Sequence, residues 1–218
     1  MKTNNTAKRI LCYGDSNTWG RVPSRMGMER YSVDKRWPGI LQEFLGEAYE
    51  IIEEGLWWRT TMFDDLRPEF PERNWLKTLP IILETHLPLD LVIIMLGTTD
   101  TKEMMNISSE KTTEGIYNII KEIKNYKILT WSKIPKILIV VPPIVKEEAE
   151  FASKLFKGAS QKWNELIEAY KKLAESEKVF YLDSTKEIKV DKEEGVHIDS
   201  ENHKKLAKII YDIIISNI

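Results

Sequence analysis

The sequence predicts a three-layer α/β/α fold around a five-stranded parallel sheet, and three observations support this prediction. Short apolar runs alternate along the chain with longer segments whose apolar residues recur at helical spacing. The run at 89–96 is almost unbroken by polar residues, as expected of a strand covered on both faces. Two runs stop abruptly at small and polar residues, first at Gly14-Asp15-Ser16 and later at Gly97-Thr98-Thr99-Asp100. Ligands of such sheets bind beyond the carboxyl ends of the strands, so these turns mark the edge at which we expect function.

The expected strands and helices follow one another in alternation. The first strand ends at Gly14, and later strands are expected at 49–53, 89–96, 137–141 and 179–182. Helices are expected at 37–45, 74–86, from Ser108 to about 125, 158–176 and 200–215. Within the helix at 74–86, Pro80 has no amide hydrogen to donate, so we expect a local break or the start of a second segment there. Residues 21–35 lack a clear period and are expected to form a long loop over the cleft, and a second long loop runs to Glu72.

The composition is that of one globular domain spanning residues 1–218. The chain has 218 residues, 42% of them hydrophobic, which is enough to bury one sizeable core. A formal net charge of −2 argues against nucleic acid as a partner. No signal-peptide core and no membrane-spanning run is visible, so we expect a soluble cytoplasmic protein that does not bind membranes. Cys12 is the single cysteine and is expected to be a buried hydrophobe, and nothing near the histidines has metal-ligand spacing, so no metal or other cofactor is expected.

A serine, a histidine and a carboxylate are placed for nucleophilic catalysis. Ser16 follows the first strand, and His197 lies in the loop before the last helix. A serine hydroxyl needs a base to remove its proton, and histidine is suited to that near neutral pH. Glu194, three residues before His197, can fold back to fix the imidazole, although Asp191 or Asp183 could take that place. The alternative for Ser16 is an ordinary turn serine, because Gly, Asp, Ser and Asn all favour turns.

These residues do not fit the α/β-hydrolase elbow, because Thr18 stands where Gly-x-Ser-x-Gly requires glycine. Instead, the chain resembles the SGNH, or GDSL, hydrolases in its Gly14-Asp15-Ser16 turn and in the acid-x-x-His pair Glu194 and His197. The resemblance is closest to the bacterial arylesterase and acyltransferase branch, some members of which also perform perhydrolysis. Further blocks that look like that branch lie at 8–12, 53–56, 59–61, 85–98 and 100–102.

The resemblance implies a flavodoxin-like sheet and a role for each matching residue. Ser16 would be the nucleophile, His197 the general base and Glu194 the group that orients it. The oxyanion donors would be the amides of Ser16 and Trp58 and a side chain at position 99. The sequence departs from the family pattern at three of these positions, with Trp58 in place of a small residue, Thr99 in place of asparagine and Glu194 in place of aspartate. A lost oxyanion donor costs roughly 3 kcal/mol, on the order of a hundredfold in rate, so we expect weak or altered esterase activity.

The remaining candidates concern the pocket and the other histidines. Trp19, Trp57 and Trp58 flank the expected active-site turns and, with Asn17 and Thr98, are expected to bind an apolar acyl or aryl group. His203 is expected to have a surface or packing role, and His86 a structural one. Asp15 is expected to stabilise its turn through backbone contacts.

The function expected from these features is that of a serine esterase or acyltransferase acting on small carboxylic esters, with water, an alcohol or peroxide as the acyl acceptor. Two alternatives remain open. One is an impaired or redesigned scaffold that binds a hydrophobic ligand, and the other is a carbohydrate O-deacetylase. A homo-oligomer is expected only by resemblance.

Overall fold

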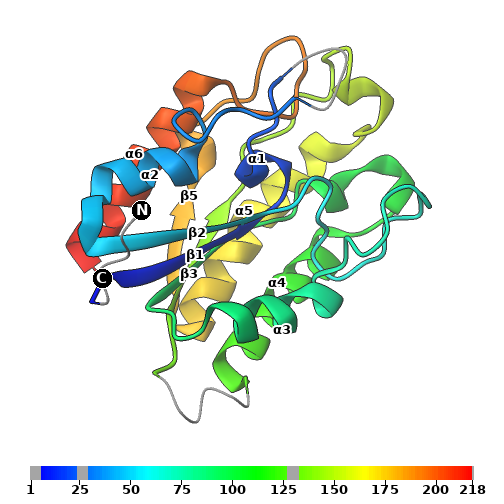
Figure 1. The fold of residues 1–218 in the computed structure, drawn as a ribbon. Helices are drawn as coiled ribbons and strands as arrows, with labels where there is room; N and C mark the ends of the chain where they lie inside the picture. Colours follow the sequence, from blue (N-terminus) through cyan, green and yellow to red (C-terminus); the bar gives the residue numbers. More distant parts are fainter. Residues whose placement is uncertain (1–5, 24–28, 127–132, 218) are drawn as a thin grey trace.

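A five-stranded parallel sheet lies between two layers of helices in a computed structural model, which describes residues 6–23, 29–126 and 133–217 (Figure 1). The strands, in chain order, are β1 (Lys8–Gly14), β2 (Tyr49–Gly55), β3 (Leu91–Met95), β4 (Lys136–Val141) and β5 (Phe180–Asp183). Their order in the sheet is β2-β1-β3-β4-β5, and every neighbouring pair is parallel. The predicted α/β fold with its flavodoxin-like order is therefore confirmed. After β1 the chain forms β2 at one edge of the sheet and then crosses to β3 on the other side of β1. This reversal of direction creates a topological switch point beside β1.

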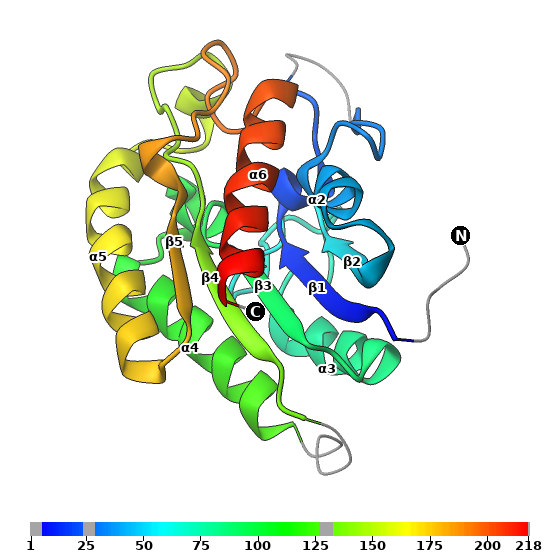
Figure 2. The ribbon, with the colours of Figure 1, turned by 90° about the vertical axis from the view of Figure 1, so that its left-hand side faces the viewer.

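Alternate residues of the strands contribute to two separate hydrophobic cores, one on each face of the sheet. Ile10 and Cys12 of β1 face the helices α2 (Trp37–Leu45) and α6 (Ser200–Asn217). Leu11 and Tyr13 face the other layer, made by α3 (Trp75–His86), α4 (Ser109–Asn125) and α5 (Ala159–Glu177). Figure 2 looks onto the layer of α2 and α6, with α3 and α4 behind the sheet. Because both faces are covered, β3 is buried along its whole length, which explains its unbroken apolar run.

Helix α3 continues through Pro80, so the expected break is wrong. Proline leaves the carbonyl four residues earlier without its partner, and that carbonyl belongs to Leu76. Leu76 is 51% exposed, so water can reach this side of the helix. The opposite side is held by packing of Trp75, Leu79 and Leu83 into the core. At its start, the Asn74 side chain accepts a hydrogen bond from the Leu76 amide at 3.0 Å, as expected of a cap.

A four-residue helix, α1 (Ser16–Trp19), follows β1 directly and was not predicted, because so short a segment shows no periodicity. The Asp15 side chain caps it by accepting from the Asn17 amide at 2.9 Å, which agrees with the expected turn-stabilising role. Gly20 ends it with a φ of 85°, a conformation that glycine adopts without strain. Of the predicted loop at 21–35, Arg21 and Arg30 form an isolated antiparallel bridge, and residues 24–28 lie outside the described residues.

The loops that follow the strands meet at the carboxyl edge of the sheet. The Arg59 guanidinium donates to the carbonyl of Gly14 at 2.9 Å, which ties the loop after β2 to the end of β1. The turn η2 (Thr99–Thr101) follows β3, and Asp100 in it accepts hydrogen bonds from the Thr61 amide and hydroxyl. None of the described helices has the length and apolar character needed to cross a membrane.

Candidate active site

The end of β1 delivers Ser16 to the carboxyl edge as the first residue of α1. A side chain at Gly14 would collide with Thr18 and with the carbonyl of Met95, so only glycine lets the turn approach β3 this closely. The Leu56 amide donates to the Gly14 carbonyl at 3.0 Å, which fixes the strand end from the other side. Ser16 is 2% exposed and is therefore almost fully buried.

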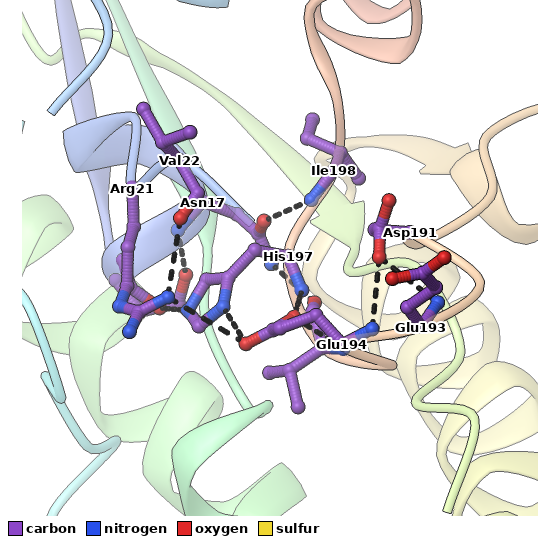
Figure 3. Close-up of polar contacts among 11 residues, drawn as sticks. Asn17, Arg21, Val22, Asp191, Glu193, Glu194, His197 and Ile198 are labelled. Carbon is purple, nitrogen blue, oxygen red and sulfur yellow. Dashed lines mark hydrogen bonds and ion pairs between the residues drawn. The ribbon is translucent and has the colours of Figure 1, made fainter. Parts of the chain in front are cut away.

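Ser16, His197 and Glu194 form a continuous chain of hydrogen bonds. His197 Nε2 lies 2.9 Å from Ser16 Oγ, although 181 residues separate the two in sequence. On the other side of the ring, His197 Nδ1 lies 2.6 Å from Glu194 Oε1. Glu194 Oε2 accepts from the amides of Val196 and His197, at 2.9 and 2.7 Å (Figure 3). Each carboxylate oxygen therefore has a partner, and the carboxylate is held in one orientation.

The surroundings of His197 favour its neutral form. Burial lowers the pKa of the imidazole, and the nearby Arg21 lowers it further, while the hydrogen bond to Glu194 partly opposes them. Burial raises the pKa of Glu194, but hydrogen bonds from His197 and the backbone outweigh it, so the net shift is downward. With Glu194 ionised, the proton of a neutral imidazole belongs on Nδ1. The lone pair of Nε2 then faces the Ser16 hydroxyl, as a general base requires.

The two alternative acids do not reach the imidazole. Asp191 Oδ1 accepts from the amides of Glu193 and Glu194, so it stabilises the turn before His197. Asp183 Oδ1 accepts from the amide and hydroxyl of Thr185. The extra methylene of Glu194, compared with aspartate, is accommodated in the loop without loss of the contact to His197.

Trp58 adopts a backbone conformation that favours glycine. Its φ is 64°, in a turn closed by a 3.0 Å hydrogen bond from the Arg59 amide to the Leu56 carbonyl. This conformation explains why a small residue suits the position. The indole stacks on Trp57 at 5.4 Å between ring centroids, and Lys102 Nζ lies 3.6 Å from the centroid of the Trp58 ring. These contacts bury Trp58 and hold its strained backbone.

The candidate oxyanion groups lie at the starts of two turns. Among the described residues, no hydrogen-bond acceptor is found for the amides of Ser16 and Trp58, so both remain available as donors. Thr99 is buried at the start of η2. The preceding Thr98 is also buried, and its carbonyl accepts from the amide and hydroxyl of Thr101. Burial raises the pKa of the neighbouring Asp100 to about 7.

The expected substrate-binding residues divide into two groups. The Asn17 side chain donates to the Val196 carbonyl at 3.3 Å and accepts from the Ile198 amide at 3.1 Å. It thus holds the backbone on both sides of His197, a structural task that sequence reasoning did not assign. Trp19 and Trp57 are partly exposed, and each has an arginine over its ring, Arg30 and Arg21 respectively.

The structure also shows residues near the site that sequence reasoning missed, two of them buried and one partly buried. Arg21 is 4% exposed and lies 3.6 Å from Glu194. Lys102 is fully buried beside Asp65 at 3.3 Å, and burial lowers its pKa to about 8. Phe151 lies beside the imidazole, 6.5 Å between ring centroids. All of these lie in segments without periodicity, where a sequence pattern gives no sign of burial.

The other two histidines form hydrogen bonds with groups other than Ser16. His203 is fully buried, and its Nδ1 accepts from the Trp37 amide at 3.2 Å, so the packing role is right and the surface role is wrong. His86 Nε2 lies 3.0 Å from Glu54 Oε1. Among the described residues, no group of three or more His, Cys, Asp and Glu side chains is placed to hold a metal ion.

Residues 12–204 match the GDSL-like Lipase/Acylhydrolase family. The chain belongs to this family. Among solved structures, an aryl esterase of M. smegmatis in an inhibitor-bound form is 38% identical, with a TM-score of 0.90 over 97% of this chain and 100% of that one. Est24, a carbohydrate acetylesterase from Sinorhizobium meliloti, is 35% identical, also with a TM-score of 0.90, over 97% of this chain and 100% of that one. A comparison with curated proteins finds no significant match.

These likenesses confirm the resemblance stated from the sequence and make this acylhydrolase a member of a family of ester-cleaving enzymes. A lipase/acylhydrolase from Enterococcus faecalis is 17% identical with a TM-score of 0.67, over 96% of each chain, and supports the fold alone.

Proposed function

We propose that this acylhydrolase cleaves small carboxylic esters through a covalent acyl-enzyme on Ser16. The observation that carries the proposal is the chain of contacts from Ser16 Oγ through His197 to Glu194, at 2.9 and 2.6 Å. This arrangement gives a weak nucleophile a neutral base and gives the base an anion that stabilises its protonated form.

The reaction proceeds in two balanced halves. Ser16 Oγ bonds to the ester carbonyl carbon while its proton passes to His197 Nε2. The amides of Ser16 and Trp58 and the Thr99 hydroxyl donate hydrogen bonds that stabilise the negative charge on the carbonyl oxygen. The ester C–O bond then breaks, and the leaving alkoxide takes the proton from His197. Water attacks the acyl carbon, gives its proton to His197, and the acid leaves as the Ser16 hydroxyl is restored. An alcohol or peroxide in place of water would complete an acyl transfer.

The small size of the acyl group follows from the packing around the nucleophile. Ser16 is 2% exposed, and the indoles of Trp57 and Trp58 stack on each other in the loop that supplies one oxyanion amide. This packing favours a short acyl chain over a long one. An acetyl group is the expected size.

A carbohydrate O-deacetylase is a second candidate, because the carbohydrate acetylesterase Est24 is as similar in structure as the aryl esterase. The two candidates share the acyl group and differ in the alcohol. We expect the purified protein to release acetate from an aryl acetate or from an acetylated sugar, and the ratio of the two kcat/KM values decides between them. Ser16→Ala should abolish both activities. An inactive wild-type protein would favour the impaired scaffold that only binds a hydrophobic ligand.

A further inference from the structure

Arg21 lies next to the predicted catalytic carboxylate without being part of the Ser16–His197–Glu194 chain. It follows Gly20 at the end of α1, and it is 4% exposed. Arg21 Nη1 lies 3.6 Å from Glu194 Oε1, the same oxygen that lies 2.6 Å from His197 Nδ1 (Figure 3). A buried guanidinium and the imidazole therefore share one carboxylate oxygen.

Two aromatic rings and a carbonyl hold the Arg21 side chain in this place. Its Cζ lies 5.5 Å from the centroid of the Trp57 ring and 5.6 Å from that of Phe151. Arg21 Nη1 also donates to the Val22 carbonyl at 3.2 Å. Packing against aromatic faces suits a planar guanidinium and directs its N–H edge to polar partners such as the carboxylate. The side chain is thus fixed by packing as well as by charge.

We propose that Arg21 is a positioning residue for the reaction proposed above, which acts by fixing the Glu194 oxygen that His197 uses. The proposal rests on that function, because it gives Arg21 a task only if His197 is the base. In this scheme Arg21 acts on the His197 imidazole indirectly, by holding Glu194 in place and by its own positive charge.

The charge of Arg21 predicts an effect on the pH range of activity. The groups that act on the charge of His197 are Glu194, which favours the imidazolium, and Arg21, which disfavours it. His203 of α6 lies near enough for the charge of His197 to lower its pKa, and the uncharged Ser16 and Phe151 also lie beside the imidazole. Since the base must be neutral in the free enzyme, activity falls when His197 gains a proton. Arg21 therefore extends activity toward lower pH.

The test is the pH dependence of kcat/KM for a neutral ester, p-nitrophenyl acetate, in the wild-type protein, three variants of Arg21 and one control variant. Arg21→Gln removes the charge, and Arg21→Met removes it while filling the space between the two rings. Both should move the acid limb of the profile to higher pH by roughly 0.5 to 1 unit. Arg21→Lys keeps a cation and should restore most of the limb. Lys172→Gln, on the exposed side of α5, removes one surface charge and should leave the profile unchanged.

Each outcome decides one of the two proposals. If the wild-type protein hydrolyses the ester and the Gln and Met variants keep the wild-type acid limb at a lower level of activity, Arg21 only packs, and the inference is overturned. If the limb moves in Gln and Met and returns in Lys, the inference stands. If the wild-type protein does not hydrolyse p-nitrophenyl acetate or an acetylated sugar, the proposed function fails first, independently of Arg21. Thermal unfolding of each variant shows whether the fold is kept.

Discussion

Thr99 stands where the resemblance to the SGNH hydrolases predicts an asparagine, and we predict that its side chain is the third oxyanion donor. Thr99 is buried at the start of η2, one residue from Asp100, which is bonded to Thr61. A threonine hydroxyl has one proton and a shorter reach than an asparagine amide. Its backbone position is nevertheless anchored, so the difference between the two residues is confined to the side chain.

We expect Thr99→Asn to raise kcat by about tenfold or more, because an amide donor strengthens binding of the oxyanion formed in the transition state. Thr99→Val has nearly the same shape as threonine and no hydroxyl, so it should lower kcat if the hydroxyl donates. Steady-state kinetics on p-nitrophenyl acetate measure both effects. Equal kcat values for the Val, Asn and wild-type proteins would remove Thr99 from the proposed mechanism.

At the scale of an element, the loop after β2 combines local strain with dense packing. Trp58 keeps a φ of 64° while its ring contacts Trp57, Arg67 and Lys102. A non-glycine residue in this region costs on the order of 1 kcal/mol, and burial of an indole offsets more than that. The contacts of the side chain thus determine a conformation that the backbone alone disfavours.

Trp58→Gly should relax the backbone and open the site. We expect the ratio of kcat/KM for a butyrate ester to that for the matching acetate to rise roughly tenfold, in line with what a hydrophobic pocket gains by admitting longer acyl chains. The same change should lower the free energy of unfolding by about 2 to 4 kcal/mol, because the cavity outweighs the relief of strain. Trp58→Phe keeps a ring on Lys102 and should change the ratio much less. An unchanged ratio in the glycine variant would place Trp58 outside the acyl pocket.

The elements differ in how much the sequence reveals of them. Helices α4 and α5 were predicted within a residue or two, because the apolar stripe of each helix and the serine cap of α4 are local signals. The continuity of α3 through Pro80 was not predictable, because it depends on which side of the helix Leu76 faces. The short α1 has too few residues for any period to show.

At the scale of the whole molecule, the sheet topology brings distant residues together. Ser16 and His197 were expected to meet because a serine nucleophile needs a base and the resemblance places that base near the end of the chain, and their side chains lie 2.9 Å apart. The link from Asp100 to Thr61 and the position of Arg21 beside Glu194 were not predictable. Both depend on the paths of irregular loops, which no periodic pattern describes.

His203 links the pH dependence of stability to the packing of α6 on α2. Burial lowers its pKa to about 3, and its Nδ1 accepts from the Trp37 amide. Because this folded-state pKa is below the value of about 6.5 in an unfolded chain, the stability contribution is complete above pH 6.5 and is lost as pH falls toward 3. His203→Asn keeps an acceptor and does not titrate. Between pH 7 and pH 4, the wild-type protein should lose about 3 kcal/mol more unfolding free energy than the variant, measured by urea denaturation. Parallel pH curves for the two proteins would contradict this assignment.

In the proposed mechanism the His197 imidazole activates the Ser16 hydroxyl, and the rate of covalent labelling at Ser16 measures this activation most directly. The wild-type protein should react with a fluorophosphonate, and mass spectrometry of its peptides should place a single adduct on Ser16. The His197→Ala variant, folded as judged by circular dichroism, should label at least a hundredfold more slowly. An adduct elsewhere, or equal labelling rates in the two proteins, would contradict the account.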